Sequence, residues 1–322
     1  MNFTWKHGAA ALTAVIIATG ALAQQRVFFG IATGGTGGTY YPLGGMLAQL
    51  ISNKAVVDGK KITATAEAAG ASVGNAKLLG NKEIESAFVA ADILDAAYRG
   101  VGQFDKAPIK NLRALGALYP ETVQLITRAD FNINSVRDLK GKSISSGAPG
   151  SGQYQLLTDL LKVYGMTRAD VKEDLSSFTQ AVDKIKDGNL HATLITAGVP
   201  TAAVTDFAQS HALKVIPLSG AEVAELQRQQ PFYASVPLPA NTYKGQTTVV
   251  PTLAVMAVWT AHDAVPEPVA YEVTKALYEN VATMAQVHAM GKSITLATAT
   301  AVGTVPLHPG SIRYFKEKGV IK

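Results

Sequence analysis

The sequence contains no cysteine, few aromatic residues (7%) and few charged residues (16%) across its 322 positions. The lack of cysteine excludes disulfide bonds, thiolate nucleophiles, cysteine-ligated zinc and a lipid anchor on an N-terminal cysteine. Basic residues exceed acidic ones by only 29 to 24, and no run of Lys or Arg is longer than two. We therefore expect no nucleic-acid partner and no polybasic membrane patch. With 48% hydrophobic residues, the chain is long enough for two globular domains.

Familiar catalytic and cofactor motifs are also missing. A phosphate-binding loop would need glycine where Val136 stands, and a dinucleotide fingerprint would need glycine where Tyr40 stands. Ser151 lacks the flanking glycines of a nucleophile elbow. No two of the six histidines are three to five residues apart, so a histidine metal site has little support. We expect no catalytic residue, no bound metal and no cofactor.

The first 23 residues have the three parts of a secretory signal peptide. Lys6 and His7 lie near the start, an apolar run follows over 9–18, and Ala21-Leu22-Ala23 precedes Gln24. The apolar run is shorter than the roughly 20 residues that span a bilayer. We expect cleavage near Ala23/Gln24 and a periplasmic mature protein.

Short apolar or β-branched runs alternate with helical patterns after Gln24, which predicts an α/β fold with two mixed sheets flanked by helices. The run 112–128 is long and interrupted by Tyr119-Pro120-Glu121, and a proline-rich stretch covers 231–251, so we expect the chain to cross between two lobes at both places. A strand over 253–259 and a long helix over about 266–290 would complete the first lobe. The expected domains are a signal peptide (1–23), lobe I (24–121 and 248–322) and lobe II (122–247).

Three loops of small residues each follow a predicted strand and lead into a predicted helix. They cover residues 33–41, 67–72 and 147–152. In an open α/β sheet, such loops lie at the carboxyl ends of the strands, where helix N-termini offer free N–H groups to an anion. Ordinary tight turns are the alternative, but three similar loops favour a ligand site. We expect N–H groups around Gly37–Thr39 and Gly150–Gly152, with the Thr39 and Ser151 hydroxyls, to bind an anion.

Other polar residues near these loops have two interpretations. Asp92 could bind a ligand ammonium, although an N-cap role is the simpler one, and Ser72 is a predicted N-cap. Tyr40 and Tyr41 could wall the crevice or pack on the sheet. Three arginines are unranked candidates for bidentate carboxylate binding, and surface positions are the alternative: Arg99, Arg113 and Arg128. Phe232-Tyr233 is interpreted as hinge packing.

Several segments together resemble the TAXI-type solute receptors of tripartite ATP-independent periplasmic (TRAP) transporters. The segments are Gly34-Gly35-Thr36-Gly37-Gly38-Thr39-Tyr40-Tyr41-Pro42-Leu43-Gly44-Gly45, Leu112-Arg113-Ala114-Leu115, Leu118-Tyr119-Pro120-Glu121, Asp138-Leu139-Lys140-Gly141-Lys142, Gly147-Ala148-Pro149-Gly150-Ser151-Gly152, Tyr271-Glu272-Val273-Thr274-Lys275-Ala276-Leu277 and Leu307-His308-Pro309-Gly310. The resemblance covers essentially the whole mature chain.

The resemblance implies a two-lobed, type II-like periplasmic-binding-protein fold with two hinge crossings, which closes on a small carboxylate such as glutamate, glutamine or a 2-oxo acid. It implies TRAP membrane subunits as the partner, and we expect a monomer. Many members have Gln-Ser-Asp or Gln-Thr-Asp where this chain has Ala90-Ala91-Asp92, which implies a less polar end of the ligand. By motif position, the site residues are Thr36, Gly37, Gly38, Thr39, Tyr40, Tyr41, Ser72, Asp92, Gly150, Ser151 and Gly152.

Two other functions remain open at the level of sequence. A secreted hydrolase or transferase could use a similar scaffold, but no pairing of nucleophile and base supports it. A receptor that presents its ligand to a signalling partner would have the same site residues. Turnover of a bound compound would favour the first, and a response that persists without the transporter would favour the second.

Export of the full-length chain should remove residues 1–23 and leave a protein that begins at Gln24. Signal peptidase needs small residues before the cut, so replacing Ala23 with the larger Leu should block processing. Intact mass and N-terminal sequencing of the exported protein test both statements. An exported product of wild-type sequence that still carries residues 1–23 would contradict them.

Overall fold

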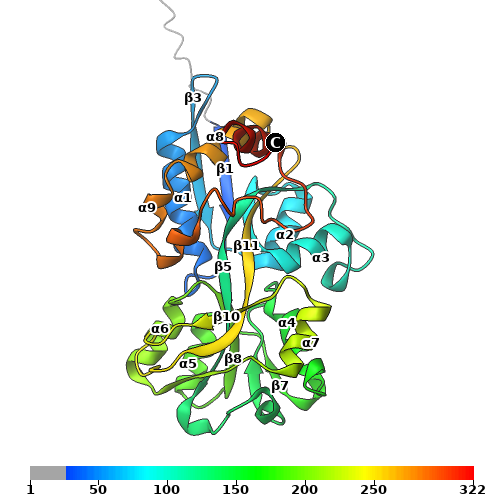
Figure 1. The fold of residues 1–322 in the computed structure, drawn as a ribbon, viewed down its shortest axis with the longest axis vertical. Helices are drawn as coiled ribbons and strands as arrows, with labels where there is room; N and C mark the ends of the chain where they lie inside the picture. The colour runs from blue at the N-terminus through cyan, green and yellow to red at the C-terminus, as the bar shows by residue number, and fades with distance from the viewer. Residues whose placement is uncertain (1–26) are drawn as a thin grey trace, which may run out of the picture.

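The computed structural model describes residues 27–322, so the signal segment and cleavage site expected over 1–24 lie outside the described residues. Figure 1 shows two halves stacked along the long axis of the molecule. The long strands β5 (Leu112–Arg128) and β11 (Val250–His262) join the two halves. We call the upper half in this view the first lobe and the lower half the second lobe.

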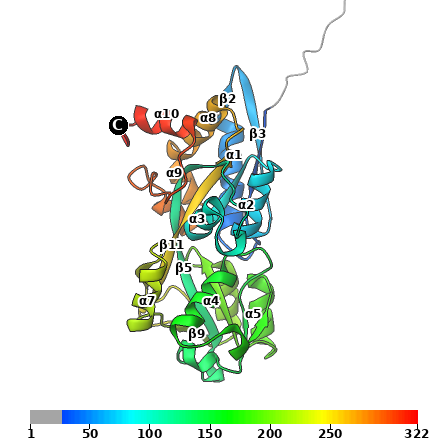
Figure 2. The same cartoon turned by 90° about the vertical axis from the view of Figure 1, so that its right-hand side faces the viewer.

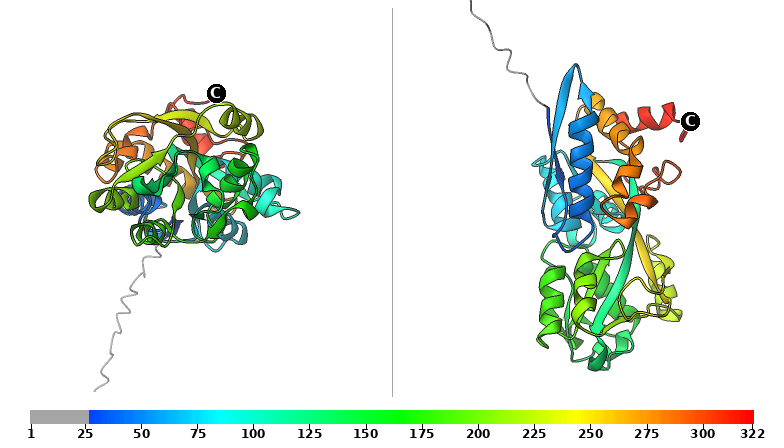
Figure 3. Two further views of the ribbon diagram at one scale, coloured as in Figure 1. Left: turned by 90° about the horizontal axis from the view of Figure 1, so that it is seen from below. Right: turned by 90° about the vertical axis from the view of Figure 1, so that its left-hand side faces the viewer.

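The first lobe is built on the strands near the start of the chain. Its strands are β1 (Val27–Ala32), β2 (Val56–Val57), β3 (Lys60–Glu67) and β4 (Ser86–Ala90). Its helices are α1 (Tyr40–Lys54), α2 (Ala71–Asn81), α3 (Ala91–Arg99), α8 (Glu267–Tyr278), α9 (Val281–Met284) and α10 (Pro309–Glu317). The helix α1 buries Leu43, Leu47 and Ile51, which share one helical face, and it lies along the sheet of this lobe (Figure 3, right).

The second lobe repeats the alternation of strands and helices. Its strands are β6 (Ser143–Ser145), β7 (Lys172–Asp174), β8 (Ala192–Ala197), β9 (Leu213–Ile216) and β10 (Ala234–Leu238). Its helices are α4 (Gln153–Val163), α5 (Phe178–Lys186), α6 (Ala202–Ser210) and α7 (Ala221–Gln229). A capping box begins α5, because Ser177 and Gln180 bond each other's backbone N–H groups.

Short 3₁₀ helices occur along the whole described chain: η1 (Gly102–Phe104), η2 (Ala129–Phe131), η3 (Val136–Leu139), η4 (Arg168–Asp170) and η5 (Ala289–Ser293).

Backbone hydrogen bonds join the strands into one mixed sheet in the order β2-β3-β1-β4-β11-β5-β8-β6-β7, with β10 beside β11 and β9 beside β5. The strands β1, β3 and β4 pair in parallel, as do β6, β7 and β8, whereas β5 and β11 run antiparallel to their neighbours. The predicted α/β class with mixed sheets and flanking helices is confirmed. The expectation of two separate sheets is wrong, because β5 and β11 extend into both lobes and join all the strands into one hydrogen-bonded sheet.

The strand β5 is continuous where we expected Tyr119-Pro120-Glu121 to interrupt it, so that expectation is wrong. Pro120 lacks an N–H, and the register between β5 and β11 shifts just beyond its partner Met256. This irregularity accommodates the proline without ending the strand. The lobe boundaries expected at residues 121 and 248 stay predictions; residue 121 lies within β5, and residue 248 lies just before β11.

The expectation of one long helix over 266–290 is also wrong. The helix α8 ends at Tyr278, and the Asn280 side chain donates to the Ala276 carbonyl at that end. The chain then forms the short α9 and η5. Side-chain bonds of asparagine compete with helix continuation, which accounts for the stop.

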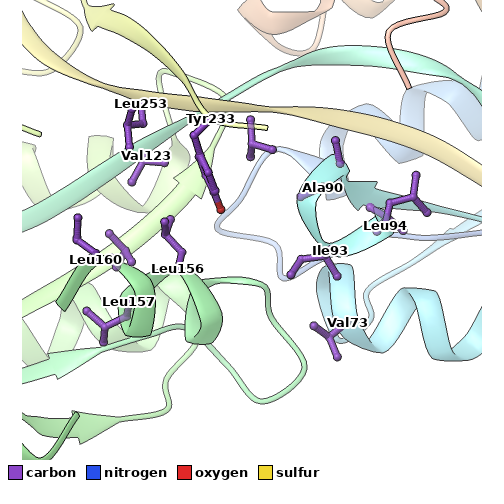
Figure 4. Close-up of a cluster of buried hydrophobic side chains, with 14 of the residues drawn as sticks. Val73, Ala90, Ile93, Leu94, Val123, Leu156, Leu157, Leu160, Tyr233 and Leu253 are labelled. Atoms are coloured by element: carbon purple, nitrogen blue, oxygen red, sulfur yellow. The ribbon is translucent and has the colours of Figure 1, made fainter. Parts of the chain in front are cut away.

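Three apolar clusters stabilise the molecule. One lies in the first lobe around Trp259, Phe29 and Leu47, and another lies in the second lobe around Phe207, Ile185 and Ile195. The third includes residues of both lobes, and Figure 4 shows Ala90 and Ile93 facing Leu156 and Leu160 across the seam, with Tyr233 between them. Figure 2 shows α2 and α3 directly above α4. Within residues 27–322, no helix has both the length and the apolar character to cross a membrane.

Candidate functional site

A cavity of about 340 Å³ lies between the two lobes. The first lobe contributes residues 34–40, 69–72, 90 and 92; β5 and β11 contribute 121 and 255; the second lobe contributes 148, 151–153, 156, 177–179, 196–197 and 233. All three loops predicted from small residues therefore reach the same cavity.

Five helices begin at the wall of this cavity. The first residues of α1, α2, α3, α4 and α5, or the residues just before them, line it. The N–H groups in the first turn of a helix have no acceptor within that helix, and the helix dipole is positive at that end. The cavity is therefore electropositive at several backbone positions without any basic side chain.

None of the residues that line the cavity is Lys, Arg or His. The three candidate arginines all lie outside the lining. Arg128 pairs with Asp130, Arg99 lies 3.3 Å from Asp95, and Arg113 donates to the backbone carbonyls of Lys110 and Leu112. Within residues 27–322, no group of three His, Asp or Glu residues could bind a metal ion.

Two carboxyl groups form the acidic side of the cavity. Glu121 is only 4% exposed, and its Oε2 accepts a 2.8 Å hydrogen bond from the Tyr40 hydroxyl. Asp92 Oδ2 accepts a 2.6 Å hydrogen bond from the Tyr233 hydroxyl. These two carboxyl groups and the two tyrosines that bond them all line the cavity. We call the four residues the acidic cluster: Asp92, Glu121, Tyr40 and Tyr233.

Burial dominates the protonation of the acidic cluster. Loss of water raises the pKa of Glu121 to about 8, the Tyr40 hydrogen bond opposes this shift, and the nearby Asp92 carboxylate adds to it. Burial also raises the pKa of Asp92, against the hydrogen bond from Tyr233. The pKa values of Tyr40 and Tyr233 lie well above 10, mainly through burial, so both hydroxyls stay neutral. At pH 7 Glu121 is therefore mostly protonated.

Nine of the eleven predicted site residues line the cavity: Thr36, Gly37, Gly38, Thr39, Tyr40, Ser72, Asp92, Ser151 and Gly152. Tyr41 is 39% exposed on α1 and lies outside the lining, so it does not wall the crevice as Tyr40 does. Gly150 also lies outside, because its carbonyl oxygen contacts the other lobe.

Several predicted donors bond within the protein instead of facing the cavity unpaired. The Thr39 hydroxyl donates to the Gly198 carbonyl at 3.1 Å, and the Ser151 hydroxyl donates to the Ser146 carbonyl at 3.3 Å. The Ser151 N–H donates to the Ala148 carbonyl, and the Gly38 N–H donates to the Gly35 carbonyl. The expected set of anion donors is thus smaller than the loops suggested.

The N-cap roles predicted for Ser72 and Asp92 are wrong. The cap of α2 is Gly70, and the Ser72 hydroxyl instead accepts a hydrogen bond from the Ala90 N–H, which joins α2 to β4. Asp92 is the second residue of α3, and its carboxylate bonds Tyr233 from the second lobe. Both side chains connect separate elements around the cavity.

Backbone contacts close the cavity at both rims. The Gly150 carbonyl accepts hydrogen bonds from the N–H groups of Val73 (2.9 Å) and Gly74 (3.0 Å), which belong to the first turns of α2. On the other rim, the Gly37 carbonyl accepts from the Ala203 N–H at 3.1 Å. These bonds connect the first lobe to the second, so the structure represents a closed arrangement.

The sequence did not indicate Glu121, Gln153 or Thr196 as site residues, and Tyr233 was interpreted only as hinge packing. One available signal was that Glu121 is the single charged residue between positions 114 and 127, within an otherwise buried strand. A lone carboxyl in an apolar strand is costly unless it has a partner or a function. The strand pattern alone did not show which cavity it faces.

Comparisons with known proteins agree with this architecture. The sequence model of the NMT1-like family matches residues 31–319. The structure is similar to the periplasmic binding protein BugD (TM-score 0.56, 13% identity), with 92% of this chain and 94% of that chain covered. It is also similar to PhnD1 from Prochlorococcus marinus (MIT 9301), solved in complex with methylphosphonate (TM-score 0.53, 9% identity, 92% and 97% covered). A third neighbour is a putative L-cystine ABC transporter from Listeria monocytogenes (TM-score 0.50, 14% identity, 84% and 98% covered).

At these identities the comparisons establish the fold, which is that of periplasmic solute-binding proteins. The chain covers nearly the whole length of each neighbour, so both lobes are included in the likeness. The two-lobed architecture predicted from the sequence is confirmed.

Replacing Gly150 with Ala should weaken lobe closure. Gly150 has φ +88°, and an added Cβ would lie 3.0 Å from the Gly70 carbonyl oxygen of the other lobe. Small-angle scattering should show a larger radius of gyration for the variant than for the wild type. Gly165→Ala is the matched control, since Gly165 has φ +72° and no atom near its Cβ position. Identical scattering from both variants would contradict a role of this contact in closure.

Glu121→Gln should change the dependence of stability on pH. The folded-state pKa of about 8 lies above the ordinary 4.5, so the unfolded chain ionises first as the pH rises, and the fold loses about 1.4 kcal/mol per pH unit between these values. The variant should match the wild type near pH 4 and exceed it by a few kcal/mol at pH 8. Urea unfolding from pH 4 to 8 measures this difference, with the exposed Glu83→Gln as control. A difference that does not vary with pH would contradict the raised pKa.

Proposed function

The chain belongs to the NMT1-like family, and we propose that it is a periplasmic solute-binding protein that captures a small carboxylate between its lobes and delivers it to a TRAP-type membrane transporter. The cavity enclosed by both lobes supports this proposal most directly, because its walls come from segments that separate when the lobes open. The proposal gives the protein no catalytic role.

The helix N-termini support an anionic ligand. Gln153 and Tyr154 begin α4, and Phe178 and Thr179 begin α5, so first-turn N–H groups of two second-lobe helices lie at the cavity. Residues 36–40 add the start of α1 from the first lobe. A carboxylate that bridges these N-termini would favour the closed arrangement over an open one, because each lobe contributes donors.

The size of the cavity suits a small metabolite. A volume of about 340 Å³ lies at the lower end of the range usual for small-molecule sites. A micromolar dissociation constant corresponds to about −8 kcal/mol, which several hydrogen bonds in a closed cavity can provide. Apolar walls from Leu156, Phe178 and Val255 would exclude water from those bonds.

The structural neighbours and the sequence resemblance support different parts of the proposal. PhnD1 in complex with methylphosphonate shows that this fold can bind a small anion. The predicted signal peptide supports a periplasmic location, and the resemblance to TAXI-type receptors supports TRAP membrane subunits as partners. The neighbour from Listeria monocytogenes, by contrast, is a putative L-cystine ABC transporter. Uptake in cells tests the choice, because TRAP transport depends on an ion gradient.

A thermal-shift screen of amino acids, 2-oxo acids and dicarboxylates should identify stabilising ligands. A ligand at 100 times its dissociation constant stabilises the fold by about 2.7 kcal/mol. Ser151→Ala should then weaken binding by roughly 1 to 3 kcal/mol if the hydroxyl turns from Ser146 to the ligand. Ser210→Ala, on an exposed end of α6, is the control. If no carboxylate in the screen binds, the ligand class is wrong; if Ser151→Ala binds normally, Ser151 is not in the site.

A further inference from the structure

The acidic cluster contains more hydrogen-bond acceptors than the protein satisfies. Asp92 Oδ1 is buried without a bonding partner, and the hydrogen bond from Tyr40 engages only Oε2 of the buried Glu121 carboxyl group. Gln153, which is 7% exposed and reaches the same cavity from α4, also has a buried Oε1 without a partner. Buried acceptors of this kind are costly unless a bound group donates to them.

The surrounding residues cannot neutralise this acidic side. Tyr40 and Tyr233 each donate one hydrogen bond to a carboxyl group, which orients Glu121 and Asp92 but brings no positive charge. No lining residue is Lys, Arg or His. Two carboxyl groups that share one closed cavity and interact electrostatically therefore need either a proton or a cation from the ligand.

We propose that the acidic side of the cavity is an ammonium subsite, in which a primary ammonium of the ligand lies between the carboxyl groups of Glu121 and Asp92 while its carboxylate faces the helix N-termini. An ammonium has three donors and no acceptor, which complements the unpaired oxygens of Asp92 and Gln153 together with the Glu121 carboxyl group. The inference rests on the proposed function and narrows it: the ligand is an amino acid and not a 2-oxo acid of the same skeleton.

Binding of an ammonium at this place exchanges a proton for a cation. Burial raises the pKa of Glu121 to about 8, so its carboxyl group carries a proton at pH 7. A bound ammonium favours the carboxylate, so the Glu121 O–H bond breaks, its proton leaves to solvent, and an ammonium–carboxylate pair forms. The release from Glu121 approaches roughly nine tenths of a proton per ligand at pH 7.

The titratable groups that face Glu121 come from both lobes. They are Tyr40 from α1, Asp92 from α3, Tyr119 on β5 and Tyr233 from the second lobe, with Asp159 of α4 adding charge near Asp92 and Tyr233. The pKa values of the tyrosines are raised well above 10, and burial raises those of both aspartates from an ordinary value near 4. Glu121, with a pKa of about 8, is protonated at pH 7, and the raised pKa of Asp92 acts in the same direction.

Calorimetry with matched ligand pairs tests the subsite. Each pair has one carbon skeleton: glutamate and 2-oxoglutarate, aspartate and oxaloacetate, leucine and 4-methyl-2-oxopentanoate, phenylalanine and phenylpyruvate. We expect the amino member of a binding pair to bind at least tenfold more tightly. Titration at pH 7 in two buffers of different ionisation enthalpy should show release of close to one proton. Putrescine and cadaverine test an ammonium without a carboxylate.

Two variants and one control separate the subsite from general effects. Glu121→Gln keeps an oxygen that accepts from Tyr40 but cannot ionise, so the amino preference should fall at least tenfold and proton release should disappear. Asp92→Asn should also reduce the preference while keeping an acceptor for Tyr233. Glu83→Gln removes the same charge from the exposed surface and should change neither quantity. Thermal unfolding of each variant verifies that it is folded.

The outcomes distinguish the subsite from the proposed function. Tighter binding of 2-oxo acids, or equal binding without proton release, would overturn the ammonium subsite and leave carboxylate capture intact. Binding of diamines but of no carboxylate would support the subsite and overturn the carboxylate ligand. Unchanged preference and proton release in Glu121→Gln would also overturn the subsite. If nothing in the panel binds at millimolar concentration, both proposals fail.

Discussion

The antiparallel pairing of β5 with β11 is the interaction on which the rest of the structure depends. Both strands extend through the two lobes, and their backbone bonds run from the pair Leu112–His262 to the pair Thr122–Ala254. This pairing sets how the lobes face each other and brings Glu121 and Val255 to the cavity. Because side chains alternate between the faces of a strand, a change of register by one residue would move Glu121 to the opposite face. The acidic side of the cavity is thus a consequence of strand register.

The cavity has a positive side made by helix N-termini, without any basic side chain, and a negative side made by carboxyl groups. Five helix N-termini provide fixed partial positive charge, and the acidic cluster provides carboxyl groups whose ionisation depends on what occupies the cavity. Fixed dipoles need no rearrangement when a ligand arrives, whereas a buried carboxyl group responds to charge through its pKa. The Gly150 and Gly37 carbonyls bond across the seam, so closure itself uses backbone groups of the loops that form the site.

Local patterns were sufficient for the loops but not for the bonds that their side chains make. Small residues after a strand and before a helix identified the loops over 33–41, 67–72 and 147–152, and all three reach the cavity. The Thr39 hydroxyl, however, bonds a carbonyl 159 residues away, and Ser72 bonds the Ala90 N–H instead of capping its helix. Such partners become neighbours only when the lobes and strands assemble. The expectation of one helix over 266–290 failed for a local reason. The Asn280 side chain donates a hydrogen bond to the Ala276 carbonyl, and this bond competes with continuation of the helix.

The sequence alone determined the alternation of strands and helices, the two-lobed fold and the loops that carry helix N-termini, because hydrophobic period and glycine placement are properties of neighbouring residues. Tertiary structure decided which of those loops' donors remain free and that Glu121, Asp92, Gln153 and Tyr233 share one cavity. It also decided the protonation of Glu121, since desolvation depends on every element packed around a carboxyl group and no segment of sequence encodes it by itself.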